Sequence, residues 1–208
     1  MKKFSFSILI LFVFTQYAIC QNGFGVKAGL NLSDQHVKFT PAPAETKQPK
    51  NYLGYQLGAF YKIKMSKRWS FSSELNFSVI GSKMLFTTED DLDSAGLIGK
   101  YYNHKMGYLE LPLSLQYNMH DFYVGGGLSV SYKLFSKLES LGKTPFYQKA
   151  DAAANVLAGY KLCKQIDVNI RYSYGLLNIL KDESVYGIYS NVTTKNRFFN
   201  LSVLYFIK

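Results

Sequence analysis

Five charged side chains stand singly among small or polar neighbours, and they are the residues of this sequence best placed to do chemistry: Lys27, Glu74, Glu110, Lys133 and Arg171. Each lies in a run where apolar and polar residues alternate, and each belongs to the polar set of its run. Opposite charges on facing walls can form ion pairs, or can relay protons or ions if water reaches all of them. These positions therefore allow either a structural charge cluster or a conducting path.

Other reactive residue types are few and scattered. The three histidines (His36, His104 and His120) lie far apart, and Cys163 is the one cysteine beyond the first twenty residues. This spacing predicts no disulfide, no metal-ligand cluster and no cofactor. Acyl transfer needs a serine beside a histidine. We expect two histidines in or at the edge of long loops and His120 in a turn, so we predict that the protein is not an enzyme.

One carboxylate cluster remains, at Glu89, Asp90, Asp91 and Asp93. Carboxylate oxygens bind Ca²⁺, but this segment lacks the full spacing and the terminal Glu of a known calcium loop. A run of like charges is usually a solvated loop. We therefore expect a solvated loop here and no metal site.

The segments that carry the five charges alternate apolar and polar residues with period two, which is typical of strands with one apolar face. Eight such runs follow one another, each about as long as the roughly 9 to 11 residues that a tilted strand needs to cross a bilayer. We predict strands over 24–33, 53–63, 69–79, 109–118, 122–134, 152–162, 166–175 and 199–208.

The connections between these strands alternate in length. Long connections are expected at 34–50, 82–104, 136–149 and 179–196, and short ones at 64–68, 119–121 and 163–165. Long external loops and short periplasmic turns are the asymmetry of a bacterial outer-membrane barrel. With an even number of strands, this order places both termini on the periplasmic side.

The polar face distinguishes a membrane barrel from a soluble, lipocalin-like one. A face exposed to water should be rich in Lys and Glu, whereas this face is mostly Gly, Ser and Asn, which fit a narrow barrel interior. The apolar face carries aromatic residues towards strand ends: Tyr61, Trp69, Tyr117, Phe122 and Tyr132. Interleaving the two faces also explains a mean hydropathy near zero (-0.06). The sequence therefore predicts an all-β, eight-stranded, antiparallel up-and-down transmembrane β-barrel, closed because open strand edges are not tolerated in hydrocarbon.

The N-terminus has the features of a secretory signal peptide: a basic start, an unbroken apolar run, and the small residues Ala18 and Cys20 before the cleavage point. We predict a signal peptide at 1–20 and an outer-membrane barrel domain at 21–208. Lipidation at Cys20 is the alternative, but bulky Ile19 would then precede the modified cysteine, where a small residue is expected.

Four segments resemble the PorT-type outer-membrane β-barrel family of Bacteroidetes: Gly25–Ser33, Tyr108–Leu113, Phe122–Gly127 and Arg171–Ile179. Leu177 departs from the last motif, which often has a small polar residue there. The resemblance implies a small barrel in the outer membrane of a Gram-negative bacterium. The member that names the family is associated with type IX protein secretion, most relatives have no established activity, and there are no catalytic residues to carry over.

Charge and loops suggest the partners. The net charge is +10, but the basic residues form no single stripe, so nucleic acid is not expected. Lys105, Lys195 and Arg197 are expected near the outer rim, where lipopolysaccharide phosphates lie. We expect a non-enzymatic structural or interaction module that contacts outer-membrane lipids, lipopolysaccharide and possible protein partners through its long loops. The alternative is an accessory factor for secretion or envelope assembly, ahead of a narrow pore or a lipid-modifying enzyme.

Lys27, Glu74, Glu110 and Arg171 fall on the inward face near the middle of their strands, and Lys133 lies inward but nearer the outer end. In such a narrow barrel, opposite charges from different walls can meet inside the lumen. Isolated interior charges are costly unless they are paired. We therefore favour an ion-pair network that fills the lumen and fixes strand register over a conducting pathway, which would need a continuous wet channel.

Overall fold

The computed structural model describes residues 23–40, 49–85, 101–139, 142–143, 147–180 and 191–207. These residues form eight long strands and the two-residue strand β6: β1 Gly23–Thr40, β2 Lys50–Lys64, β3 Trp69–Leu85, β4 Tyr101–Met119, β5 Phe122–Leu138, β6 Gly142–Lys143, β7 Ala150–Lys161, β8 Ile166–Gly175 and β9 Asn191–Ile207. In this part of the chain, no helix is long and apolar enough to cross a membrane.

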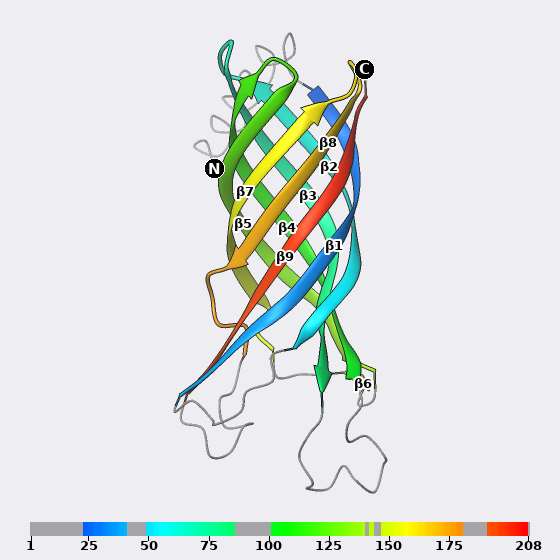
Figure 1. Cartoon of the computed structure of the whole chain (residues 1–208), viewed down its shortest axis with the longest axis vertical. Coiled ribbons are helices and arrows are strands. Elements are labelled where there is room, and N and C mark those ends of the chain that lie inside the picture. The colour runs from blue at the N-terminus through cyan, green and yellow to red at the C-terminus, as the bar shows by residue number, and fades with distance from the viewer. Residues whose placement is uncertain are drawn as a thin grey trace, which may run out of the picture.

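The long strands close on themselves. Each one pairs antiparallel with the next along the chain, and β9 pairs with β1 from Phe24↔Ile207 to Thr40↔Asn191. The result is the predicted eight-stranded up-and-down barrel, with steeply tilted strands (Figure 1). One end, here called the turn end, holds the start of β1, the end of β9 and the short turns; the other is called the loop end.

The period-two alternation in the sequence becomes two faces of the barrel wall. Apolar side chains point outwards and stay exposed, for example Leu53 (62% exposed), Leu128 (61%) and Leu201 (56%). Their polar neighbours point inwards, and Asn31 and Asn76 are completely buried. A continuous exposed apolar wall around a polar interior suits a hydrocarbon environment, because closure pairs the backbone of every strand.

The strands are longer at the loop end than the sequence pattern predicts. Parts of the expected connections 34–50, 82–104, 136–149 and 179–196 are strand, since β1 reaches Thr40 and β4 already begins at Tyr101. These extensions carry polar residues on both faces, as in the cross-strand pair Asp34↔Arg197, so their sequence no longer alternates. The backbone ladder nevertheless continues through them, and the strands extend beyond the apolar part of the wall.

The interior of the loop end contains an apolar cluster beside buried polar side chains, which the alternation does not predict. A buried cluster, here called the apolar plug, consists of Ile80, Met106, Tyr108, Tyr147, Ile179, Leu180, Val192 and Phe198. The segments before β7 and after β8 meet in it, through the Tyr147↔Leu180 bridge. Aromatic residues are therefore not confined to the lipid-facing wall, and Phe60 and Tyr123 are likewise buried near the turn end.

Candidate functional site

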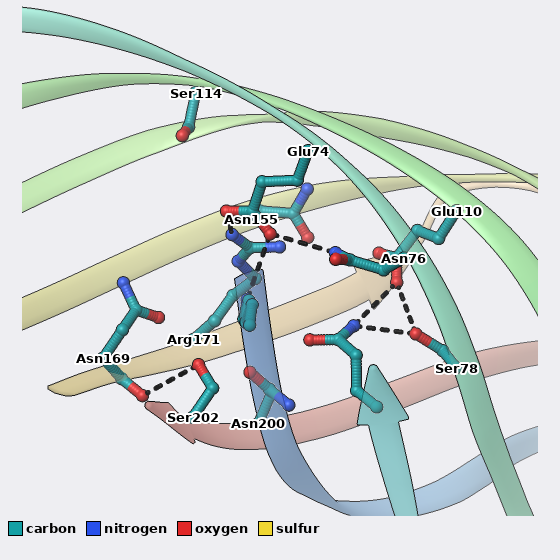
Figure 2. Close-up of polar contacts among 12 residues, drawn as sticks. Glu74, Asn76, Ser78, Glu110, Ser114, Asn155, Asn169, Arg171, Asn200 and Ser202 are labelled. Atoms are coloured by element: carbon teal, nitrogen blue, oxygen red, sulfur yellow. Dashed lines mark hydrogen bonds and ion pairs between the residues drawn. The ribbon is translucent and has the colours of Figure 1, made fainter. Parts of the chain in front are cut away.

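Three of the five predicted lumen charges meet at the centre of the barrel. The Glu74 carboxylate of β3 accepts a hydrogen bond from Lys27 Nζ of β1 at 3.0 Å, and its other oxygen is contacted by Arg171 Nη2 of β8. Asn76 Nδ2 donates to the same carboxylate at 2.9 Å. All three charged side chains are at most 3% exposed. Figure 2 shows Arg171 reaching across the lumen towards Glu74. These residues are called the Glu74 cluster.

Glu110 lies inside the barrel beside this cluster, and its hydrogen-bond donors are neutral. Its Oε2 accepts from Ser78 Oγ at 3.0 Å and from Gln56 Nε2 at 3.2 Å (Figure 2). The charges of Lys27 and Arg171 thus balance those of Glu74 and Glu110, which limits the cost of placing these four groups in a narrow lumen. A further buried carboxylate, Asp151, accepts a hydrogen bond from Asn196 Nδ2 at 2.9 Å.

Lys133 belongs to a different part of the interior. Its Nζ donates to the backbone carbonyl of Tyr147 at 2.5 Å and lies 5.5 Å from the centre of that ring. Lys133 thus ties β5 to the segment that contributes to the apolar plug. The structure brings Lys27, Glu74 and Arg171 into contact, and Lys133 lies nearer the loop end.

The lumen is closely packed within the described residues. A cavity of about 20 Å³ lies between Glu110, Tyr108 and Phe198, which is room for about one water molecule. Several buried polar atoms, among them Arg171 Nε and Nη1, have no protein hydrogen-bond partner. The polar middle of the barrel is thus suited to hold single waters, while the apolar plug covers it on the loop side.

The expectation that no histidine lies within a strand beside a serine is wrong. His104 lies inside β4, and its Nε2 is 2.9 Å from Ser136 Oγ of β5, while its Nδ1 is 3.4 Å from Gln35 Oε1. Sequence alternation missed this pair because both residues lie in the strand extensions. His104 is 1% exposed and its ring stacks with Tyr147 at 4.7 Å. Ser136 is buried as well, so the pair is a polar contact inside the barrel.

The other candidate ligands stay apart. His36 is part of β1 and not of a loop, and His120 lies in the turn after β4 with a φ of 54°. Cys163 is exposed and makes no disulfide. Among the described residues, no three His, Cys, Asp or Glu side chains are grouped closely enough to hold a metal ion. The carboxylate cluster at 89–93 lies outside the described residues.

Lysines gather on the outer wall of the strand extensions, in a set that the sequence did not reveal. Lys50 pairs directly with Lys83 across β2 and β3, and Lys105 pairs with Lys137 across β4 and β5. All four are exposed. Like charges directly opposite each other destabilise a sheet. This set, here called the lysine belt, could only be found from the strand register.

Two basic residues near the belt, Arg197 and Lys195, contact side chains of other strands. Arg197 is engaged by Asp34 through two hydrogen bonds, one of them 2.8 Å from Nη2 to Oδ2. Lys195 lies two residues before Arg197 on β9, and its Nζ is 5.6 Å from the centre of the Tyr174 ring. Arg197 therefore already has an anionic partner. Lys50 of the belt, like Lys195, lies over an aromatic ring, with its Nζ 4.0 Å from the centre of the Tyr101 ring.

The closed wall, its exposed apolar surface and its polar, packed interior define a transmembrane β-barrel of the outer-membrane type. The match to a known family agrees with this class and extends over most of the chain. The chain belongs to the outer membrane protein beta-barrel domain family, whose sequence model matches residues 14–181. This assignment points to the outer membrane of a Gram-negative bacterium.

Three solved structures are among those to which the chain is similar. Ail of Yersinia pestis, solved with the heparin analogue sucrose octasulfate, is 14% identical with a TM-score of 0.49; the match covers 90% of this chain and 99% of Ail. Neisserial surface protein A is 12% identical (TM-score 0.49; 89% and 97% covered). OprG of Pseudomonas aeruginosa is 13% identical (TM-score 0.45; 90% and 96% covered). No curated protein sequence matches the chain.

Proposed function

We propose that this outer-membrane barrel is a non-enzymatic structural and interaction module with a closed lumen. The observation that carries the proposal is the Glu74 cluster, which joins three strands across the barrel while the apolar plug covers the loop side. A conducting path would need continuous water, and the packing favours isolated waters instead. The short turns at one end support an orientation with the turn end, and both termini, in the periplasm.

Measurements of conductance test whether the lumen is closed. The purified protein is inserted into planar bilayers, with a porin in the same bilayers as the positive control. The expected result is no stable unitary conductance, because the Glu74 cluster and the apolar plug lie in series along the lumen. Reproducible single-channel steps from the folded protein would contradict the proposal.

The lysine belt supports lipopolysaccharide as the lipid partner at the loop end. Two pairs of facing lysines are unfavourable alone, and anionic phosphates placed between them would relieve the repulsion. Lys105 and Lys195 take part from the outer wall, while Arg197 contributes less because Asp34 already neutralises it. In this proposal, the belt binds lipopolysaccharide phosphates and sets the depth of the barrel in the outer leaflet.

A charge swap at one belt position separates lipid binding from barrel stability. Lys83→Glu converts a repulsive pair with Lys50 into an attractive one, so the barrel should gain up to about 1 kcal/mol in lipopolysaccharide-free detergent. The same variant should retain less lipopolysaccharide in a pull-down. Lys105→Gln with Lys195→Gln should lower retention without the gain in stability. Unchanged retention in both variants would contradict the proposal.

A narrower assignment is part of the same proposal. The four segments similar to PorT-type barrels of Bacteroidetes support membership in that group, and the long connections at the loop end offer a surface for a protein partner. Purification from native membranes tests it. Recovery of secretion-apparatus components with the protein would favour the accessory role in secretion over a general structural one.

A further inference from the structure

A basic cavity of about 740 Å³ opens at the turn end of the barrel. Its lining includes five lysines and one carboxylate: Lys62, Lys64, Lys67, Lys161, Lys164 and Asp167. The lysines come from the ends of β2 and β7 and from the turns that follow them, which are about a hundred residues apart in the sequence. The fold thus concentrates positive charge that looks scattered along the chain. The cavity is called the basic vestibule.

The inner part of the basic vestibule is built from buried, fixed groups. Lys62 Nζ lies 4.0 Å from Asp167 Oδ2 and 4.0 Å from the centre of the Tyr123 ring. The side chains of Lys62 and Asp167 are only 11% and 4% exposed. Oδ2 of Asp167 accepts no hydrogen bond from the protein. The ammonium group of Lys62 is therefore held in place in the inner part of the vestibule.

Aromatic rings mark the side of the vestibule that faces the lumen. Phe206 lines the cavity and packs edge to face against Phe60, with 4.9 Å between the ring centres. Phe60 is 2% exposed. The vestibule therefore ends on packed side chains, and an occupant would enter and leave by the same mouth.

Lys161 is positioned at the rim by its own contact, because its Nζ donates to the carbonyl of His120 at 3.0 Å. Lys64, Lys67 and Lys164 are exposed around the same mouth. Asp167 can neutralise one of the five lysines, so most of the positive charge stays uncompensated. A concave site lined by one sign of charge concentrates ions of the opposite sign.

We propose that the basic vestibule binds a phosphate-bearing anion. Its volume lies in the range of ligand pockets, roughly 300 to 1,000 Å³. Its cations are lysines, whose compact ammonium groups bind phosphate oxygens as point charges and can approach them from several directions. Two sources supply this chemistry: the headgroup of an anionic phospholipid at the membrane surface, and a soluble phosphate ester from the compartment that the mouth faces.

Cys163 provides a reporter, because it is exposed and lines the vestibule. The reaction rate of its thiol is measured with a negatively charged and a positively charged methanethiosulfonate reagent, on the full-length protein in neutral detergent. We expect the anionic reagent to react about tenfold faster at low salt, with the ratio falling as salt increases. A Cys163→Ser variant measures any labelling elsewhere in the chain.

Two binding experiments then distinguish a soluble phosphate ester from a lipid headgroup as the bound anion. In the first arm, millimolar pyrophosphate is added in neutral detergent; in the second, the protein is placed in nanodiscs of phosphatidylcholine with or without phosphatidylglycerol. Slower labelling of Cys163 by an uncharged thiol reagent reports occupancy. Protection by pyrophosphate supports a soluble ligand, and protection only by phosphatidylglycerol supports a lipid headgroup.

The charge dependence is tested with two sets of three substitutions. Lys67→Gln, Lys161→Gln and Lys164→Gln remove vestibule charges, and Lys50→Gln, Lys83→Gln and Lys105→Gln remove the same number at the loop end. Heat-modifiable mobility on gels establishes that both variants are folded. Only the vestibule set should abolish the reagent preference and the protection. Equal rates for both reagents in the unsubstituted protein, or no protection in either arm, would overturn the proposal.

Discussion

Neutralising Glu74 should destabilise the barrel more than neutralising any other buried carboxylate of the lumen. In Glu74→Gln, the shape of the side chain is kept, but Lys27 and Arg171 lose their anion while both remain buried. Removing one partner of a buried ion pair costs about 3 to 5 kcal/mol, because the remaining charge is left uncompensated. Lys27 and Arg171 contact different oxygens of Glu74, and in the variant one of those oxygens becomes an NH2 group that cannot accept a hydrogen bond, so we expect a loss in this range.

Glu110→Gln is the matched control. It removes the same charge from the same lumen, but the donors to Glu110 are the neutral side chains of Gln56 and Ser78. The amide oxygen of the variant can still accept from both, so the expected cost is about 1 kcal/mol. Both variants lose one negative charge. Their difference therefore isolates direct contact with the cations from the net charge of the lumen.

Reversible urea unfolding in lipid vesicles measures both changes, followed by the fluorescence of Trp69, the one tryptophan of the chain. A triple variant (Lys27→Met, Glu74→Leu, Arg171→Met) should recover most of the stability lost in Glu74→Gln, since it leaves no unpaired charge. Equal losses for the two single variants would refute the ion-pair reasoning, and so would a triple variant less stable than Glu74→Gln.

Two further predictions concern packing and the buried histidine. Gly127→Ala should cost more than about 2 kcal/mol, because a Cβ there would overlap the carbonyl oxygen of Leu113 on β4. In the control, Gly126→Ala, the Cβ would be 3.4 Å from its nearest neighbour, so stability should change by less than about 1 kcal/mol. Urea unfolding measures the free energy of both variants. Ser136→Ala should lose about 1 kcal/mol of stability, because the hydrogen bond to His104 is lost. Mass spectrometry of lipid A should give the same spectrum with and without overexpression of the protein. A lipid A mass shift that depends on Ser136 would instead show that the pair is catalytic.

The sequence was sufficient for the fold where each strand has one apolar and one polar face. The run from Phe24 to Ser33 alternates because β1 separates an apolar outer face from a polar lumen there, and the pattern disappears from Asp34 onwards, where the outward residues become polar as well. Strand ends were therefore predicted too early at the loop end. The apolar plug was not predictable either, since Ile179 and Leu180 lie beyond β8 and enter the barrel only through long-range contacts.

The candidate sites divide in the same way. Alternation alone assigned Lys27, Glu74 and Arg171 to the polar face, but which of them touch depends on strand tilt and register. The lysine belt and the basic vestibule consist of residues from separate strands and turns. Their charges are visible in the composition as a net charge of +10, and their grouping exists only in the closed barrel.

The seam between β1 and β9 has a consequence for biogenesis. The seam joins the first strand of the barrel to its last, so the ladder cannot form until the whole barrel sequence is available. Until then, β1 and β8 each present an unpaired backbone edge, which hydrocarbon does not tolerate. Insertion must therefore be coupled to closure, because a chain that lacks β9 exposes both edges. A partly synthesised barrel is not a smaller working version of the protein.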